Sequence, residues 1–212
     1  NTYSPTTVPG LSGVQAIALA DYAGFAVHTD GTVSSWGSSS EGVRGNGTSS
    51  YSPSPLAKIS GLTGVRSIHA NSYTACAAKK DGTAWCWGYN NYGQLGDNSK
   101  TQRTVPTKVA GLSNVATLGV GERATCAALN DGTVTCWGYN KYGLLGDNST
   151  TERLKPQTKV KGLTDVVQLA DNFIAPCALK KDGSVYCWGF GPDTGDGSST
   201  NALVPVLVTG SK

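Results

Sequence analysis

One short motif occurs four times in this chain, and its fixed spacing constrains the fold more than any other feature. An Asp-Gly pair is followed at a constant distance by a Trp-Gly pair, and successive copies lie 51, 50 and 51 residues apart. A Gly-Leu pair precedes each copy. The Asp-Gly pairs begin at Asp30, Asp81, Asp131 and Asp182, the Trp-Gly pairs at Trp36, Trp87, Trp137 and Trp188, and the Gly-Leu pairs at Gly10, Gly61, Gly111 and Gly162. Self-similarity at a period of this length is typical of a repeat architecture, which forms an extended surface rather than a single catalytic cleft.

The composition fits short strands joined by tight turns. The chain has 212 residues, with 28 Gly and 9 Pro, and only 15% of its residues are charged, which is typical of an extracellular or surface-exposed module. The net charge is +3 without a Lys/Arg cluster, so we expect no nucleic-acid partner. No apolar run approaches the roughly 20 residues of a membrane span, so we expect no membrane insertion. Because the chain starts at Asn1 and contains no Met, we expect a processed chain or a piece of a longer protein.

The second copy shows how one repeat is expected to fold. Residue types predict strands over 65–70, 75–78 and 83–87, with Asp81 and Gly82 in a hairpin loop. A further extended segment contains Pro106, which favours an edge strand. Three or four antiparallel strands recurring at fixed intervals form a propeller blade. The sequence therefore predicts an all-β, β-propeller-type repeat domain of four blades, each a small antiparallel sheet. We expect one domain over residues 1–212, with repeats over approximately 10–60, 61–110, 111–161 and 162–210.

Six cysteines fall in three pairs, each centred on an Asp-Gly pair. The pairs are Cys76 and Cys86, Cys126 and Cys136, and Cys177 and Cys187. In a three-residue hairpin loop with a Gly bulge, the two cysteines face each other at a non-hydrogen-bonded position, with Cα atoms about 4.5 Å apart. We therefore predict three intra-hairpin disulfides and an extracellular, secreted or cell-surface location. The alternative is three pairs of buried free thiols. The first repeat has Phe25 and Ser35 at these positions. Zinc is disfavoured, because ligand pairs two to four residues apart are absent and there are only two His.

The two ends of the chain contain the same strand signal. A Pro-containing segment that ends in Val or Ile precedes each Gly-Leu pair and occurs once more near the C-terminus, five times in all, including residues 5–8 and 205–208. Four blades therefore leave one strand spare. This strand is redundant in a closed four-blade ring, pairs with a neighbouring chain by strand addition, or belongs to an open arc with exposed edges.

The third repeat carries a specific resemblance. Its residues 126–147 read CAALNDGTVTCWGYNKYGLLGD. This segment resembles the regulator of chromosome condensation repeat family, and its paired cysteines resemble the bacterial extracellular branch. The resemblance extends over essentially the whole chain and implies a β-propeller. It implies less about function, because the family includes a chromatin-bound nucleotide exchange factor, ubiquitin-ligase modules and secreted β-lactamase-inhibitor proteins.

Two departures from the family pattern are evident. Family members often have His two residues before the Cys position, where this chain has Ala23, Thr74, Ala124 and Ala175. The exchange-factor surface therefore has no support from a motif. Family propellers also usually have seven blades, whereas this chain has four repeats.

No residue set predicts catalysis, a metal or a cofactor. His28 and His69 do not recur and have no evident nucleophile partner, and neither G-x-S-x-G nor H-E-x-x-H occurs. Asp97, Asp147 and Asp196 recur in oxygen-rich loops, which favours turns that satisfy their own backbone over a calcium site. We therefore expect no catalytic residues, no metal, no cofactor and no enzyme activity.

Aromatic residues are the best ligand-binding candidates. The four Trp of the Trp-Gly pairs recur in register and are expected to pack the blades. The turn after the Trp strand carries further rings, which bind a protein or a sugar ring or pack between neighbouring blades. Trp85 is distinctive, because its counterparts are Ser34, Thr135 and Tyr186. The candidates are Trp85, Tyr89, Tyr92, Tyr139, Tyr142 and Phe190.

These features predict a secreted or cell-surface, non-enzymatic binding module that presents propeller loops to a protein or glycan ligand, in adhesion or recognition. The alternative is a structural assembly unit of a larger surface protein or of a multimer, with self-association through a terminal strand.

Overall fold

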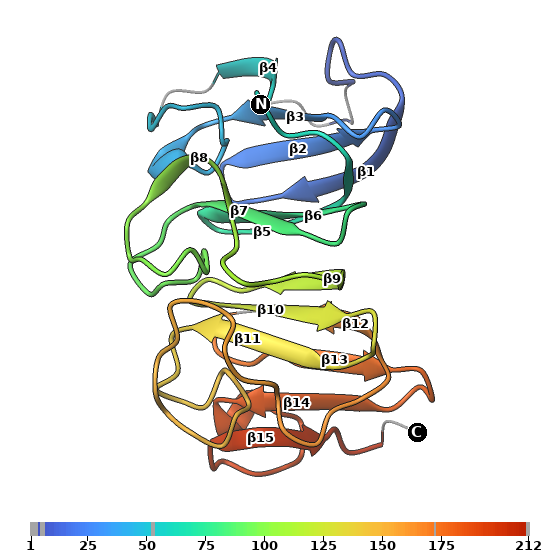
Figure 1. Ribbon diagram of the computed structural model, residues 1–212, viewed down its shortest axis with the longest axis vertical. Coiled ribbons are helices and arrows are strands. Elements are labelled where there is room, and N and C mark those ends of the chain that lie inside the picture. The colour runs from blue at the N-terminus through green and yellow to red at the C-terminus, as the bar shows by residue number, and fades with distance from the viewer. Residues whose placement is uncertain (1–3, 5–6, 52–53, 172, 211–212) are drawn as a thin grey trace.

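Four antiparallel sheets follow one another along the chain (Figure 1). The computed structural model describes residues 4, 7–51, 54–171 and 173–210, so Pro5 and Thr6 of the N-terminal spare segment lie outside the described residues. The strands of the first two sheets are β1 Val14–Leu19, β2 Ala23–His28, β3 Val33–Gly37, β4 Ser54–Lys58, β5 Val65–Asn71, β6 Thr74–Lys79, β7 Ala84–Gly88 and β8 Arg103–Lys108. Those of the last two are β9 Val115–Val120, β10 Ala124–Leu129, β11 Val134–Gly138, β12 Val166–Ala170, β13 Cys177–Lys180, β14 Val185–Gly189 and β15 Ala202–Leu207. Each sheet is one propeller blade, as predicted.

Within each blade the strands pair in the order in which they occur in the chain. The fourth strand is therefore the outer edge, and Pro55, Pro106 and Pro205 lie in these outer strands, β4, β8 and β15. An edge position tolerates Pro because only one side of the strand needs backbone donors. The prediction of an edge strand from Pro106 is confirmed.

The third blade departs from this pattern. Its fourth strand is reduced to two isolated bridges, Thr135 with Lys159 and Gly138 with Arg153. The segment from Arg153 to Val160 is one residue longer than the segment from Arg103 to Val109 in the second blade. An extra residue disrupts the ladder of backbone hydrogen bonds locally. This insertion also explains the 51-residue spacing between the third and fourth motif.

The hairpin register agrees with the prediction. Cys76 pairs with Cys86 between β6 and β7, and the other two cysteine pairs lie at the same position of their blades. The structure contains all three disulfides, each with Cα atoms 4.1 Å apart. In the first blade the corresponding pair is Phe25 and Ser35.

The four blades form an open arc. Their first strands lie side by side, with β1 against β5, β5 against β9, and β9 against β12. Within the described residues, β1 and β12 do not pack together as these neighbours do. The first and fourth blades lie at opposite ends of the long axis in Figure 1. The described residues thus do not close a four-blade ring.

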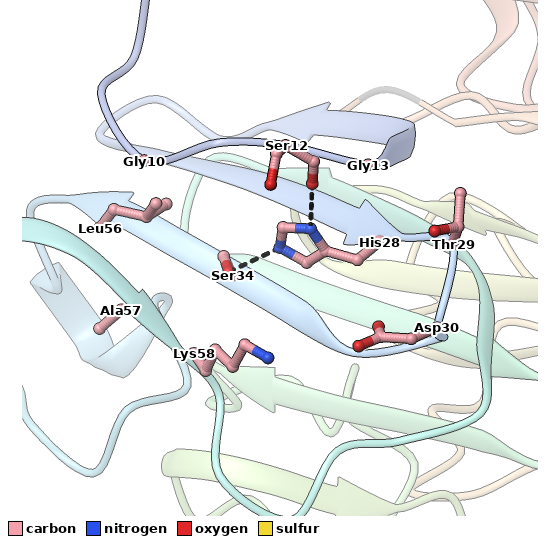
Figure 2. Close-up of a pocket in the computed structure, with 10 residues that line it drawn as sticks. All are labelled: Gly10, Ser12, Gly13, His28, Thr29, Asp30, Ser34, Leu56, Ala57 and Lys58. Atoms are coloured by element: carbon pink, nitrogen blue, oxygen red, sulfur yellow. Dashed lines mark hydrogen bonds between the residues drawn. The ribbon is translucent and has the colours of Figure 1, made fainter.

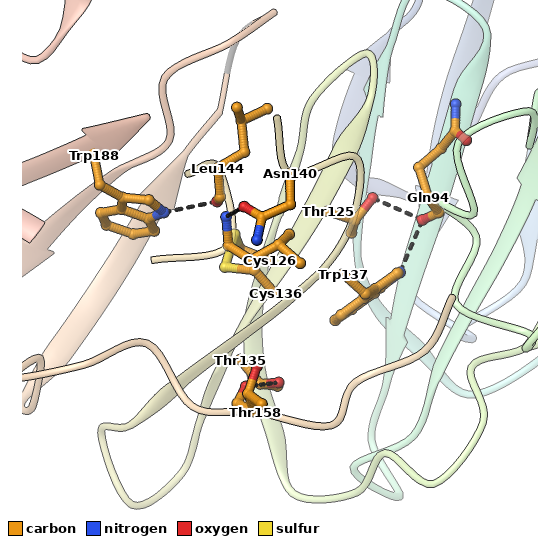
Figure 3. Close-up of a disulfide and its surroundings, with 11 residues drawn as sticks. Gln94, Thr125, Cys126, Thr135, Cys136, Trp137, Asn140, Leu144, Thr158 and Trp188 are labelled. Atoms are coloured by element: carbon orange, nitrogen blue, oxygen red, sulfur yellow. Dashed lines mark hydrogen bonds between the residues drawn. A yellow bond between two sulfur atoms is a disulfide. The ribbon is translucent and has the colours of Figure 1, made fainter. Parts of the chain in front are cut away.

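A tryptophan joins each blade to the one before it. Trp87, Trp137 and Trp188 are fully buried, and their indole N–H groups donate to backbone carbonyls of the preceding blade. Trp137 donates to Gln94 at 2.8 Å and Trp188 to Leu144 at 2.8 Å, on the two sides of the Cys126–Cys136 disulfide (Figure 3). The recurring Trp therefore packs the blades, as expected. The glycines at 45, 96 and 146 lie where a Cβ would come within 3 Å of this packing, since the Trp or, at 146, Val160 occupies that space.

Candidate binding face

The predicted Tyr and Phe candidates lie at one end of the blades. Two kinds of loop meet there, the turn between the first two strands of a blade and the segment after the third strand. They are joined by backbone hydrogen bonds, such as Tyr89 N–H to Tyr73 O at 3.0 Å and Tyr139 N–H to Arg123 O at 2.9 Å. We call this end the aromatic face.

Five half-buried rings form one continuous row on the aromatic face. Each ring meets the next edge to face, with centroids 5.3–6.1 Å apart. In order, the row is Tyr89, Tyr92, Tyr139, Tyr142 and Phe190. The contacts Tyr92–Tyr139 and Tyr142–Phe190 cross from one blade to the next, so these rings pack between blades as well as reaching the surface. Packing between blades, one of the two roles considered for these rings, is therefore observed, and ligand binding stays a prediction.

Arg123 lies over this row at the turn between β9 and β10. Its guanidinium carbon is 5.1 Å from the centre of the Tyr92 ring and 5.5 Å from that of Tyr139. It is also 4.3 Å from the centre of the Phe173 ring, which is 43% exposed. Stacking of a guanidinium on ring faces is an attractive contact that also fixes the side chain. Neither Arg123 nor Phe173 was predicted from the sequence, because their counterparts in the first two blades are of different residue types.

A buried asparagine holds the loop that carries the first two rings. The Asn90 side chain is fully buried, and its Nδ2 donates to the carbonyls of Ser99 at 3.2 Å and Thr101 at 2.9 Å. Its Oδ1 accepts the Leu95 N–H at 3.0 Å. Asn140 makes the same set of bonds in the third blade. Since a side chain closes the loop from within, Tyr89 and Tyr92 are held in place without regular secondary structure.

A cavity of about 220 Å³ opens on the aromatic face beside the start of the row. Four tyrosines and two glutamates dominate its wall, and none of its lining residues is basic. The lining residues are Glu41, Tyr51, Tyr73, Thr74, Tyr89, Tyr92 and Glu122. Aromatic rings combined with carboxylates form an environment that favours a cation. We call it the tyrosine–glutamate cavity.

Glu41 reaches this cavity from a strained backbone. Its φ of 54° and ψ of 19° lie in the left-handed region, which residues other than Gly seldom adopt. Alignment of the repeats places Glu41 where the second and third blades have Tyr92 and Tyr142. The first blade therefore supplies a carboxylate at a position that supplies a ring elsewhere.

Trp85 lies apart from the aromatic face. It is on β7 near the Asp81 hairpin tip, at the other end of the blade, and pairs with Ala77 across the hairpin. It is half-buried, its Nε1 donates to Thr83 Oγ1 at 3.2 Å, and Lys79 Nζ lies 5.5 Å from its ring centre. It packs against the core shared by the first two blades. The structure does not bring Trp85 together with the other five candidates.

A second cavity, of about 430 Å³, lies at the hairpin end of the first blade (Figure 2). His28 lies on its wall, with Nδ1 donating to Ser12 O at 2.8 Å and Nε2 accepting from Ser34 Oγ at 2.8 Å. The sequence showed no evident nucleophile partner for His28, whereas the structure places the Ser34 hydroxyl beside its ring. Ser34 follows six residues later on the returning strand, which places it diagonally across the hairpin. Ser34 is only 3% exposed, and the bonds fix the ring in one tautomer.

The oxygen-rich loops use their carboxylates to close turns. Asp97 Oδ1 accepts the Ser99 N–H at 3.0 Å, and Asp97 Oδ2 accepts Arg103 Nε at 2.7 Å. Burial acts to raise the pKa of Asp97, but the hydrogen bonds from Ser99 and Arg103 outweigh it, so the pKa lies below its ordinary value. Asp147 makes the corresponding turn in the third blade. In the described ranges, no three His, Cys, Asp or Glu side chains are grouped so as to hold a metal ion.

A family profile described as the Regulator of chromosome condensation (RCC1) repeat matches residues 81–128 and 131–170. A second profile of the same description matches 65–94 and 115–144, so that the two together span half of the chain. The chain belongs to the RCC1 repeat family. The resemblance inferred from residues 126–147 is thereby confirmed at the level of the family.

The relatives of this RCC1-repeat chain are longer proteins. It is 33% identical over 108 residues to the Ultraviolet-B receptor UVR8 of Arabidopsis thaliana, a match that covers 49% of this chain and 24% of the receptor. Its fold superposes on Prp20p of Saccharomyces cerevisiae with a TM-score of 0.84 at 22% identity, over 98% of this chain and 53% of Prp20p. Human WBSCR16 gives a TM-score of 0.83 at 22% identity, over 98% and 56%. The chain thus spans about a quarter of that curated relative and about half of these solved structures.

Proposed function

We propose that this chain is a secreted or cell-surface module that binds a protein through the aromatic face and catalyses no reaction. The tyrosine–glutamate cavity carries the proposal, and it receives a basic side chain of the partner. Four tyrosines provide ring faces, and Glu41 and Glu122 provide negative charge. Arg123, which is not in the wall, has its Nε 4.0 Å from Glu122 Oε1 and offsets part of this charge. A cation over ring faces contributes about 0.5–1 kcal/mol at an exposed site and about 2 kcal/mol when desolvated.

The protein partner is favoured over a glycan by the geometry of the rings. Sugar rings stack on open, flat aromatic faces, whereas the five rings of the row meet edge to face and cover part of one another's faces. Half-buried rings fixed by their neighbours offer contact area at a low cost in conformational entropy. Prp20p, on which this fold superposes, binds Gsp1p and histones, and this supports a protein partner for the present chain.

An extracellular setting is supported by the three disulfides, since such bonds persist in oxidising compartments. They are the same cysteines that resemble the extracellular branch of the family. In the described part of the chain, no helix has the length and apolar character needed to cross a membrane.

Titration with defined probes tests the proposal. A tetralysine peptide, tetramethylammonium and chitotetraose are each titrated into the protein while amide chemical shifts are followed by NMR. We expect the peptide and tetramethylammonium to shift the amides around Tyr89 and Glu122. Replacing both glutamates, as Glu41→Gln with Glu122→Gln, should weaken peptide binding about tenfold, because two ion pairs of about 0.7 kcal/mol each are lost.

Glu152→Gln is the control for the loss of a surface carboxylate, because Glu152 is a more exposed acid that pairs with Lys100 and does not line this cavity. It changes the charge by one unit and should leave the affinity unaltered. Binding of chitotetraose without the peptide would make the aromatic face a glycan site. Binding of none of the three probes would refute the proposed function.

A further inference from the structure

The same pair of apolar surfaces joins the blades at all three junctions. Each blade presents a leading face, formed by its Gly-Leu segment and first strand, to the blade before it. In the second blade this face comprises Leu62, Val65 and Ile68, which are at most 5% exposed. Each blade also presents a trailing face, formed by its middle hairpin, to the blade after it.

The trailing face is equally well covered at the three junctions. In the third blade it includes Cys126, Ala128 and Val134, which are at most 1% exposed and pack on Leu163, Val166 and Leu169. In the first and second blades the corresponding side chains are fully buried. They are Phe25, Val27 and Val33, and Cys76, Ala78 and Ala84.

The leading face of the first blade is uncovered. Val14, Ile17 and Leu19 are 39%, 66% and 67% exposed, whereas Val65 and Ile68 at the first two of these positions in the second blade are 0% and 5% exposed. The side chains are as apolar as their buried counterparts. Large exposed apolar side chains grouped on one strand mark a contact surface.

The trailing face of the fourth blade is uncovered as well. Cys177, Leu179 and Val185 are half-buried there, although their counterparts in the other three blades are fully buried. Leu179 is moreover larger than the Ala78 and Ala128 that occupy its position in the second and third blades. The two open ends thus present the two complementary halves of a junction that the molecule already contains three times.

The side chain of Trp36 also indicates that a contact is missing at the open ends of the molecule. Trp36 is half-buried, and no carbonyl in the described part of the chain accepts its indole N–H, unlike the three other Trp of this motif. The receiving loop at the other end of the molecule has Gly195 where the other blades have Gly45, Gly96 and Gly146. The loop that would receive a Trp from a following blade therefore has Gly at the same position as the loops at the internal junctions.

We infer that two copies of this chain associate head to tail, with the trailing face of each fourth blade on the leading face of the other copy's first blade. The chain covers 53% and 56% of the two solved relatives, so two copies together contain slightly more chain than one of these relatives. Closure covers both open ends of both copies, which limits assembly to a dimer rather than a filament. This contact uses blade faces and differs from strand addition at the terminus.

Light scattering coupled to size exclusion tests the inference. The chain has a mass of 21.8 kDa, and we expect twice that mass at micromolar concentration. Ile17→Lys on the leading face and Leu179→Lys on the trailing face should each raise the dimer dissociation constant at least about 100-fold, because each places a charge in an apolar contact. Val105→Lys is the control, since Val105 is 49% exposed on the outer strand β8.

Mixing the two variants distinguishes head-to-tail pairing from other arrangements. Each variant alone lacks one half of every junction, whereas a one-to-one mixture contains one intact leading face and one intact trailing face. We expect the mixture to form dimers that neither variant forms alone. Circular dichroism verifies that both variants are folded. A wild-type monomer at all concentrations, or a Leu179→Lys variant that dimerises alone, would overturn the inference.

Discussion

Replacement of Asn90 by Ala is expected to destabilise the second blade more than any change at its exposed neighbour. The Asn90 side chain is fully buried and binds three backbone groups, the Leu95 N–H and the carbonyls of Ser99 and Thr101. The orphaned Leu95 N–H costs about 1–3 kcal/mol, because it is buried and its acceptor is gone. The two carbonyls lie nearer the surface, and water replaces part of what they lose.

The expected loss in the free energy of unfolding is therefore about 2–4 kcal/mol. Asn91→Ala is the matched control, because the exposed Asn91 side chain donates only to the Tyr89 hydroxyl. It should change stability by less than about 0.5 kcal/mol. Asn90→Asp keeps the shape but places a second carboxylate 3.3 Å from Asp97 Oδ1, so it should cost at least as much as the Ala variant.

Urea unfolding followed by tryptophan fluorescence, under oxidising conditions, provides the measurement. Asn140→Ala repeats the experiment in the third blade, where the same bonds occur, and should lower the midpoint by a similar amount. If Asn90→Ala and Asn91→Ala shifted the urea midpoint equally, the buried amide would not hold the loop, and the reasoning would fail.

Three further outcomes are expected. The pKa of Asp97 is depressed in the folded state, so the ionised carboxylate stabilises the fold. This contribution is complete above the unfolded value near 3.8 and is lost as the pH falls through the lower folded value. The urea midpoint should therefore drop in this acid range, and it should drop less in the Asp97→Asn variant. Replacing Cys126 and Cys136 together by Ala should cost about 2–3 kcal/mol, measured by the same unfolding assay, since the closed loop is short. Trp137→Phe should cost about 2–3 kcal/mol, because it removes buried ring atoms and the 2.8 Å bond to the preceding blade; thermal unfolding without a shift would contradict this.

The strand register and the edge strands could be predicted from the sequence, because they depend on local chemistry. The Asp-Gly hairpin fixes the register of its two strands, and this register alone places Cys76 opposite Cys86. The edge position of Pro106 followed from its missing N–H. Each of these deductions concerns residues close together in sequence, so no tertiary information was required.

The candidate site could be predicted only in part, because its residues are far apart in the sequence. Tyr89 and Tyr92 were predicted from a recurring turn, but the tyrosine–glutamate cavity also needs Glu41 and Glu122 from two other blades. Neither glutamate belongs to a local motif, and their proximity depends on how blades stack. Trp85 stood out because it breaks the repeat, yet it lies at the opposite end of the blade from these residues.

Three deviations from the repeat lie in the first blade, and they bear on where function lies. That blade lacks a disulfide, has Glu41 in place of a tyrosine, and buries Arg44 where the next two blades have Leu95 and Leu145. A repeat that serves only packing gains nothing from Glu41 or Arg44, since each places a charged side chain where other blades have a tyrosine or a leucine. The Glu41 deviation faces the regular second blade, and the tyrosine–glutamate cavity forms where these two blades meet Glu122 of the third. The repeat therefore accounts for the scaffold, whereas its exceptions mark the surface most worth mutating first.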